Sequence, residues 1–243
     1  IWKLAKKYNF FIIEDASHSL GASRKKNLVG NCKWSDICIF SFHPVKIITT
    51  GEGGMAVTNN KNVYEKLDIL KNHGITRKQS DLKIKKLGFW YYEQHVLGFN
   101  YRLSDISAAL GISQLKSLNK FISERNNIAK RYNHLLKKLP VRSQEIKKEN
   151  KSSFHLYIIL LDLKKIKKNY NQIFSSLRKK GIMINLHYLP VHLQPFYKSF
   201  GFKKGSFPVS ENYSKRAISL PIYPGLKEKE QKKIVKTLTK IIT

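Results

Sequence analysis

Short apolar runs alternate with amphipathic stretches in the first half of the chain. Trp2 to Tyr8 has the spacing of the end of an amphipathic helix. Phe10 to Ile13 is a continuous apolar run, typical of a strand that is buried on both faces of a parallel sheet. The runs Ile37 to Phe42 and Met55 to Thr58 predict two more strands, and Asn59 to Leu70 predicts a helix. This alternation of helices and strands predicts an α/β fold.

A long helix is predicted to lead from this part of the chain into a second unit. Ser104 is a favourable N-cap, Asp105 complements the helix dipole, and apolar residues recur at helical spacing toward the break at Pro140. Beyond the break, the pattern predicts strands at Phe154 to Leu161 and Ile182 to His187 and helices at Tyr170 to Lys180 and Lys227 to Ile241. We therefore expect two domains, residues 1–125 and a small α+β domain at residues 126–243.

The charge of the chain is its one unusual compositional feature. Its 46 Lys and Arg residues outnumber 16 Asp and Glu, which gives a net charge of +30. Such a charge can attract nucleic acid, an anionic membrane or a nucleotide-linked substrate. The lysines are spread from Lys3 to Lys240 and accompany no nucleic-acid-binding motif, so we interpret them as a solvated surface. We expect no specific nucleic-acid partner.

Membrane and metal sites are also not expected. No apolar run is long enough to span a bilayer, so no membrane insertion is predicted. Cys32 and Cys38 are the only cysteines, which provides neither a disulfide framework nor a zinc site. A reducing cytoplasm is the expected location, and no bound metal is expected.

Residues that could take part in catalysis lie near the ends of the predicted strands. Asp15 follows the first strand, Ser41 lies at the end of the second, Lys46 comes just after it, and a glycine-rich turn at residues 51–54 precedes the third. Taken alone, Asp15 is as well explained by a helix cap or an ion pair, and Lys46 by an exposed surface position. Together they fit pyridoxal chemistry: a lysine forms the Schiff base, a carboxylate holds the pyridinium proton, and hydroxyl groups hold the phosphate.

Three motifs in order resemble the DegT-type family of sugar aminotransferases. They are EDASHSLGA, SFHPVKIITTGEGG and LGFNYRLSDISAALG, and the resemblance runs from Ile1 to the C-terminus. It implies the pyridoxal-phosphate-dependent transferase fold of aspartate aminotransferase (type I), with a partial large domain followed by the small domain. The phrases YYEQHVLGFNYRLSDI, INLHYLPVHLQPFY and SLPIYPGL are most similar to the branch that acts on UDP-linked 4-keto-6-deoxy-N-acetylhexosamines in pseudaminic acid synthesis.

The resemblance implies a role for each candidate cofactor residue. Lys46 would bind the cofactor covalently and move the proton between substrate and cofactor, and Asp15 would pair with the pyridine nitrogen. His18 would lie beside the ring, and Ser41 would bind the phosphate. Asn100 would reach the same phosphate in the active site of a neighbouring subunit, which implies a homodimer with shared active sites.

The resemblance also implies the substrates and the reaction. His187 and Tyr188 occupy positions that contact the sugar nucleotide in the related branch. Arg102 would offer its charge to a diphosphate or a carboxylate, with a structural salt bridge as the alternative. A lysine at position 46, where some relatives that act as dehydratases carry histidine, favours transamination. We expect an amino group to move from a donor, glutamate, to the 4-keto carbon of a nucleotide-linked deoxysugar.

The resemblance also indicates that the start of the family's large domain is missing from this chain. That part supplies a helix N-terminus for the phosphate and part of the sugar site, so we expect these 243 residues to be a fragment that is inactive by itself. Two alternatives remain open. One is an aminotransferase for a dTDP- or GDP-linked keto-sugar, and the other is a catalytically inactive basic protein that binds polyanions.

Overall fold

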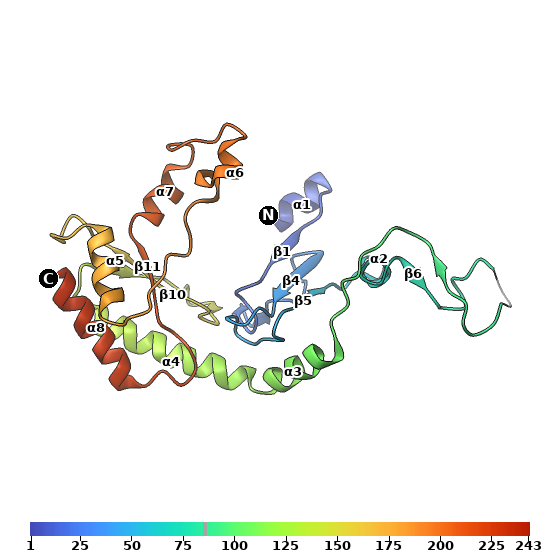
Figure 1. Cartoon of the computed structure of the whole chain (residues 1–243), viewed down its shortest axis with the longest axis horizontal. Coiled ribbons are helices and arrows are strands. Elements are labelled where there is room, and N and C mark those ends of the chain that lie inside the picture. The colour runs from blue at the N-terminus through green and yellow to red at the C-terminus, as the bar shows by residue number, and fades with distance from the viewer. Residues whose placement is uncertain (85–86) are drawn as a thin grey trace. The chain divides into compact units, whose positions relative to one another are not determined.

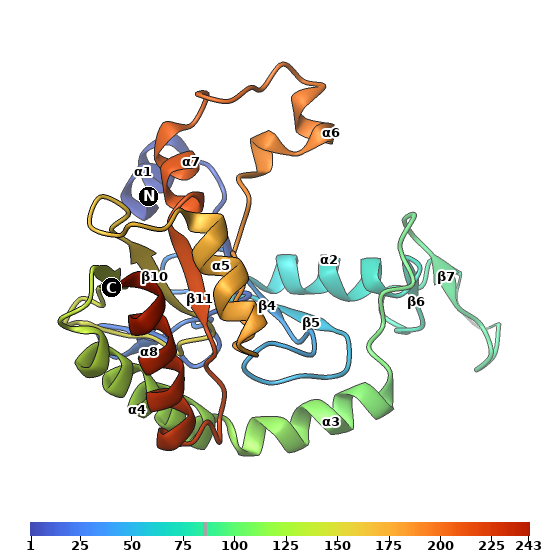
Figure 2. The same ribbon diagram turned by 60° about the vertical axis from the view of Figure 1, so that its left-hand side comes forward.

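The computed structural model describes residues 1–84 and 87–243. The chain forms two compact units, unit 1 at Ile1–Leu118 and unit 2 at Asn119–Thr243. Figure 1 and Figure 2 show the elements of each unit. The change from one unit to the next falls at the start of the helix α4 (Leu118–Leu136), and residue 125, the predicted domain boundary, lies within the same helix.

Unit 1 is built around a three-stranded sheet with the strand order β1-β4-β5. In chain order, unit 1 contains α1 (Trp2–Tyr8), β1 (Ile13–Asp15), β2 (Ser23–Arg24), β3 (Asn27–Leu28), β4 (Ile37–Ser41), β5 (Gly54–Val57), α2 (Lys61–Lys71), β6 (Ile75–Thr76), β7 (Glu93–Gln94) and α3 (Asp105–Lys116). β1 and β4 run parallel, whereas β5 runs antiparallel to β4. Cys38 and Phe40 of β4 are buried on one face of this sheet.

The apolar run at the start of β1 is largely exposed, so the prediction that it is buried on both faces is wrong. Phe11 is 77% exposed and Ile13 is 61% exposed. β1 is an edge strand, and its only neighbour among the described residues is β4. The composition of the run is that of a strand covered on both faces, but within the described chain its side chains remain largely exposed.

The helices of unit 1 begin where side chains cap their first N–H groups. The Oδ1 atom of Asn60 accepts from the backbone of Asn62 and Val63 at the start of α2, and the Oγ atom of Ser104 accepts from Ser107 N at the start of α3. The predicted N-cap at Ser104 is therefore confirmed. The long helix predicted to follow it is two helices, α3 and α4, with Ser117 between them.

Unit 2 has an antiparallel sheet with the strand order β11-β10-β8. After α4 it contains β8 (Val141–Ser143), β9 (Asn150–Lys151), β10 (Tyr157–Leu161), α5 (Tyr170–Lys179), η1 (Val191–Leu193), α6 (Pro195–Lys198), α7 (Pro208–Ser214), β11 (Ala217–Leu220) and α8 (Glu228–Ile242). Alternate residues of β10 point into a core to which α4, α5 and α8 also contribute, and α5 contacts α8 (Figure 2). None of the helices that the structure describes is both long enough and apolar enough to cross a membrane.

The segment at residues 182–187 departs from its predicted strand. It makes a single bridge, from Asn185 to Ser219 of β11, and β11 itself was not predicted. Ile182 and Ile184 are nevertheless buried in the core. Burial therefore explains the apolar pattern, but the backbone does not continue along a neighbouring strand.

A long excursion leaves the core of unit 2 after this bridge and carries η1, α6 and α7 before the chain returns as β11. The carboxylate of Glu211 in α7 links this segment to η1 and to the loop before α7. The Oε1 atom of Glu211 accepts from His192 Nε2 at 2.9 Å, Gly205 N at 2.7 Å and, more weakly, Phe207 N at 3.5 Å. His192 and Glu211 are both buried, so this junction is shielded from water.

Candidate active site

Asp15, at the end of β1, and Ser41, at the end of β4, lie at one edge of the unit 1 sheet. Asp15 pairs with Ile39 in the parallel register, and Ala16 N donates to Ile39 O at 2.9 Å. Ser41 lies two residues further along β4, on the same face as Asp15 because side chains alternate along a strand. The carboxyl ends of parallel strands form the edge at which open α/β sheets bind ligands.

Asp15 is held in its ionised form by the turn that follows it. The backbone N–H of Ser17 donates to Asp15 Oδ1 at 3.0 Å, and the Ser17 hydroxyl donates to the same oxygen. These bonds stabilise the carboxylate and lower the pKa of Asp15, and the charges of His18 and Lys46 lower that pKa further. Asp15 is therefore a fixed negative charge at neutral pH.

Lys46 lies in the turn after β4, where its backbone N–H donates to His43 O at 2.9 Å. Partial burial lowers the pKa of the Lys46 amine, and the charge of Asp15 opposes this effect. Each of the two side chains acts on the pKa of the other, so the carboxylate and the amine share one electrostatic environment. Lys46 consequently loses its proton more readily than a fully solvated lysine.

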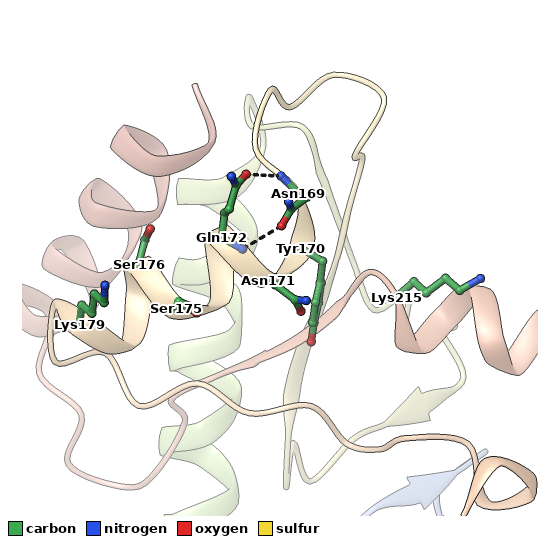
Figure 3. A pocket seen from close by; sticks show the side chains of 8 residues that line it. All are labelled: Asn169, Tyr170, Asn171, Gln172, Ser175, Ser176, Lys179 and Lys215. Carbon is green, nitrogen blue, oxygen red and sulfur yellow. Dashed lines mark hydrogen bonds between the residues drawn. The ribbon is translucent and has the colours of Figure 1, made fainter.

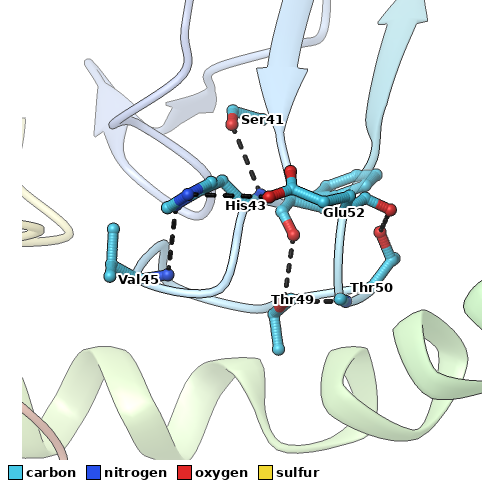
Figure 4. Close-up of polar contacts among 8 residues, drawn as sticks. Ser41, His43, Val45, Thr49, Thr50 and Glu52 are labelled. Carbon is cyan, nitrogen blue, oxygen red and sulfur yellow. Dashed lines mark hydrogen bonds and ion pairs between the residues drawn. The ribbon is translucent and has the colours of Figure 1, made fainter.

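Hydrogen bonds hold the turn that carries Lys46 (Figure 4). The Ser41 hydroxyl accepts from His43 N at 3.4 Å, and His43 Nδ1 accepts from Val45 N at 3.5 Å. On its other side, His43 Nε2 lies 3.7 Å from Glu52 Oε1. His43 thus ties the two ends of the turn together.

The glycine-rich loop packs closely against α3. Thr50 is 3% exposed, and its hydroxyl donates to Glu52 O at 2.7 Å. A Cβ atom at Gly111 of α3 would lie 2.8 Å from Thr50 Cγ2, and one at Gly53 would lie 2.3 Å from Thr50 Oγ1. Both glycines are required by this close approach, which fixes the loop that follows Lys46.

Asn100 and Arg102 occupy a different part of unit 1. Both are exposed, and the Oδ1 atom of Asn100 accepts from Arg102 Nε at 3.3 Å and from Arg102 Nη2 at 3.2 Å. Within residues 1–84 and 87–243, Arg102 forms no ion pair, so the structural salt bridge considered as an alternative for it is absent from the described chain.

His187 and Tyr188 belong to unit 2. The Nδ1 atom of His187 and the Ser219 hydroxyl are 2.7 Å apart, and Tyr213 Oη donates to His187 O at 3.3 Å. The rings of His187 and Tyr188 pack edge to face, with centroids 4.7 Å apart. Tyr188 is 62% exposed, so this pair presents an aromatic surface to solvent.

The predicted site residues thus form three groups: Asp15, His18, Ser41 and Lys46 at the sheet edge, Asn100 with Arg102, and His187 with Tyr188. Ser17, whose two hydrogen bonds are the main cause of the low Asp15 pKa, was given no role from the sequence. A serine two residues after an aspartate is a turn signature that could have identified it.

A separate hollow lies on unit 2 and contains none of the predicted residues (Figure 3). It is lined by the exposed side of α5 and by Lys215. At the start of α5, Asn169 N donates to Gln172 Oε1 and Gln172 N donates to Asn169 Oδ1, so these groups already have hydrogen-bond partners. We interpret this hollow as a solvated helix surface. In the part of the chain that the structure describes, no three His, Cys, Asp or Glu side chains are placed to hold a metal ion.

The chain is similar to known proteins over nearly its whole length. The model of the DegT/DnrJ/EryC1/StrS aminotransferase family matches residues 1–239. The UDP-4-amino-4,6-dideoxy-N-acetyl-beta-L-altrosamine transaminase of Campylobacter jejuni serotype O:2 is 40% identical, over 100% of this chain and 61% of that protein.

Two solved structures show the same similarity. Helicobacter pylori PseC, an aminotransferase involved in the biosynthesis of pseudoaminic acid, matches with a TM-score of 0.89 and 32% identity, over 100% of this chain and 62% of that one. A putative sugar aminotransferase from Streptococcus pneumoniae in its PLP form matches with a TM-score of 0.85 and 28% identity, over 99% and 61%. The expected type I fold is confirmed, and the chain spans about three fifths of the length of these relatives.

Proposed function

Because this chain belongs to the DegT/DnrJ/EryC1/StrS aminotransferase family, we propose that it carries the lysine-bearing part of a pyridoxal-phosphate-dependent sugar aminotransferase. The observation that carries the proposal is the coupling of Asp15 and Lys46 at the sheet edge where ligands bind. An ionised carboxylate, an amine that readily loses its proton, and the nearby Ser41 hydroxyl fit the three functional ends of this cofactor.

Each of these residues has one task in the proposed reaction. Pyridoxal phosphate, when bound, supplies an electron-withdrawing ring that makes the exchange of an amino group possible. Asp15 would hold the proton on the ring nitrogen, because its own low pKa keeps the carboxylate ionised. Lys46 Nζ would hold the cofactor and, as a free amine, would accept and return a proton during the exchange. The Ser41 hydroxyl would donate to the phosphate, and His18 would contact the ring.

The amino acceptor that we propose is a UDP-linked 4-keto-6-deoxy-N-acetylhexosamine, with glutamate as the donor. The similarity to the Campylobacter and Helicobacter proteins supports this choice. His187 and Tyr188 would contact the sugar nucleotide, and Arg102 would meet its diphosphate. The cytoplasmic location stays a prediction.

We further propose a homodimer in which Asn100 of one subunit reaches the cofactor phosphate of the other. The surroundings of Asn100 support this proposal. Phe99 and Tyr101 stack on each other and are both exposed, and none of the residues of α3 is buried. An exposed apolar surface of this kind is typical of a contact between subunits.

The test is an absorbance spectrum of the full-length protein with pyridoxal phosphate, followed by borohydride reduction. We expect a reducible band in the wild type that is absent from Lys46→Ala. Lys71→Ala is the matched control, because Lys71 is an exposed lysine on α2 that pairs with Asp68 at 2.8 Å. Glutamate should bleach the band, and UDP-, dTDP- and GDP-linked keto-sugars should then be compared as acceptors.

The outcomes separate the competing functions. A band that persists in Lys46→Ala would refute the role of Lys46. Turnover of only dTDP- or GDP-linked sugars would keep the aminotransferase and reject the UDP-linked substrate. If no band forms and the protein binds nucleic acid with a strong salt dependence, the basic polyanion-binding protein replaces the enzyme.

A further inference from the structure

Ser219 is the one polar side chain of β11 that touches a predicted substrate residue. Each residue of β11 is buried, and Ser219 itself is 6% exposed. It pairs with Ile158 of β10, whereas the adjacent pair, Ile159 and Ile218, faces the core. Because side chains alternate along a strand, Ser219 points away from that core and toward the opposite face of the sheet.

On that face, Ser219 holds both the backbone and the ring of the segment that passes over it. Its N–H donates to Asn185 O at 2.8 Å, and Asn185 N donates back to Ser219 O at 3.4 Å. Its hydroxyl lies 2.7 Å from Nδ1 of His187, two residues further on. These contacts fix the position of the segment relative to the strand and the rotation of the imidazole ring.

The orientation of His187 passes on to Tyr188. The two rings are nearly perpendicular, at 85°, with centroids 4.7 Å apart. Tyr213 Oη holds the His187 carbonyl at 3.3 Å, so the backbone between the two rings is restrained as well. The hydroxyl of the buried Ser219 thereby restrains how the half-buried His187 and the exposed Tyr188 are presented.

We propose that Ser219 is a positioning residue for sugar-nucleotide binding, and that it acts through His187. The proposal rests on the proposed function. Ser219 does not meet the substrate, but its hydroxyl restrains the rotation of the imidazole through the contact with Nδ1. It thereby sets the angle at which His187 and Tyr188 present their hydrogen-bonding and aromatic groups. Imidazole and phenol rings in this arrangement suit a ligand with polar hydroxyl groups and a flat ring, as a sugar nucleotide has.

The first test compares Ser219→Ala with wild type in the full-length holoenzyme, using the UDP-linked 4-keto-6-deoxy-N-acetylhexosamine. The loss of one hydrogen bond predicts a KM for the sugar nucleotide that is about three- to tenfold higher. The KM for glutamate and the borohydride-reducible band at Lys46 should not change. Ser219→Thr retains the hydroxyl and should restore most of the affinity.

A double-mutant cycle separates positioning from a general loss of structure. If Ser219 acts through His187, adding Ser219→Ala to His187→Ala should not raise the KM further. The ¹⁵N shift of His187 Nδ1 should also change in Ser219→Ala, because this nitrogen loses its hydrogen bond with the Ser219 hydroxyl. Additive effects on KM, or unchanged ring shifts, would overturn the proposal.

The band at Lys46 distinguishes this failure from failure of the proposed function. A normal band together with additive KM effects rejects only the role of Ser219. Absence of the band in the wild type rejects the enzyme itself.

Discussion

The two units of this chain differ in how they hold their residues in place. Unit 2 buries one face of its sheet beneath α4, α5 and α8, and its core includes Ile159, Leu177 and Leu238, all without exposed surface. In unit 1, neither α2 nor α3 has a buried residue, and large apolar side chains remain exposed along β1 and α3. Apolar packing therefore dominates unit 2.

In unit 1, hydrogen bonds and close backbone contacts contribute more to holding the residues in place. The turns after β1 and β4 are held by Ser17, His43 and Thr50, each of which bonds within a few residues along the chain. Asp15 and Lys46, the residues with candidate cofactor chemistry, thus lie in the unit whose helices bury fewer apolar side chains. Stability and the proposed cofactor chemistry are consequently separable by mutation.

The largest effect is expected from Ile159→Ala. Ile159 is fully buried in β10, and its truncation should lower the free energy of unfolding of unit 2 by about 2–5 kcal/mol. Ile13→Ala, on the exposed edge strand of unit 1, should cost no more than about 0.5 kcal/mol.

Two optical probes separate the units in this experiment. All three tryptophans, Trp2, Trp34 and Trp90, lie in unit 1, so their fluorescence reports its unfolding. Far-UV circular dichroism, followed in urea, includes the helices of unit 2. A similar loss of stability in the two variants would remove the contrast between the units.

A smaller effect on stability is expected from Gly111→Ala. Helix propensity alone would make this variant more stable, but we expect it to be less stable. Alanine in a helix interior is normally favourable by about 0.5–1 kcal/mol, but here the new Cβ would lie 2.8 Å from Thr50 Cγ2. We expect a net destabilisation of about 1–2 kcal/mol in the tryptophan-detected transition, as is typical of overpacking. Thr50→Ser removes Cγ2 and keeps the hydroxyl, so it should relieve the clash in the double variant. A stabilised Gly111→Ala would show that α3 and the loop are not in this contact.

The smallest effect is a shift in the pKa of Lys46. The charge of Asp15 raises that pKa against the effect of burial, so Asp15→Asn should lower it. The deprotonated, nucleophilic amine would then persist to lower pH. Titration of ¹³C-methylated lysines by NMR, with Lys46→Arg for assignment, measures this shift.

Glu14→Gln is the control for the pKa of Lys46. Glu14 is adjacent to Asp15 in β1 but alternates to the opposite face, where it accepts from the Ser35 hydroxyl at 3.2 Å. An equal shift in both variants would mean that Lys46 responds to net charge rather than to Asp15.

Local signals in the sequence were sufficient to predict the N-cap of α3 and the two strands that form the sheet edge. Ser104 caps α3 as predicted, and Asp15 and Ser41 end two strands that are adjacent and parallel. The failures depend on distant neighbours. Ile182 to His187 has a strand-like pattern, yet its pairing with β11 is limited to a single bridge at Asn185. No local pattern specifies which strand, if any, will lie beside such a run.

The site shows the same division between local and distant information. The roles expected for Lys46 and Asp15 came from residue type, from position at strand ends and from the resemblance to the family. The anchoring of His187 by Ser219, 32 residues further along the chain, could not be read from spacing, because the contact arises only when β11 returns to the sheet.

The Glu211 junction has a consequence for which changes of length this chain can tolerate. His192 and Glu211 are 19 positions apart in sequence, yet they meet at one carboxylate at the base of the excursion. Lengthening a closed loop is inexpensive, at about 0.6 kcal/mol for each doubling. Gly205 and Phe207 also bond to Glu211 and must keep their places, so the stretch that can change length while the junction stays intact is residues 194–204. The length of this stretch is therefore nearly independent of the fold that supports it.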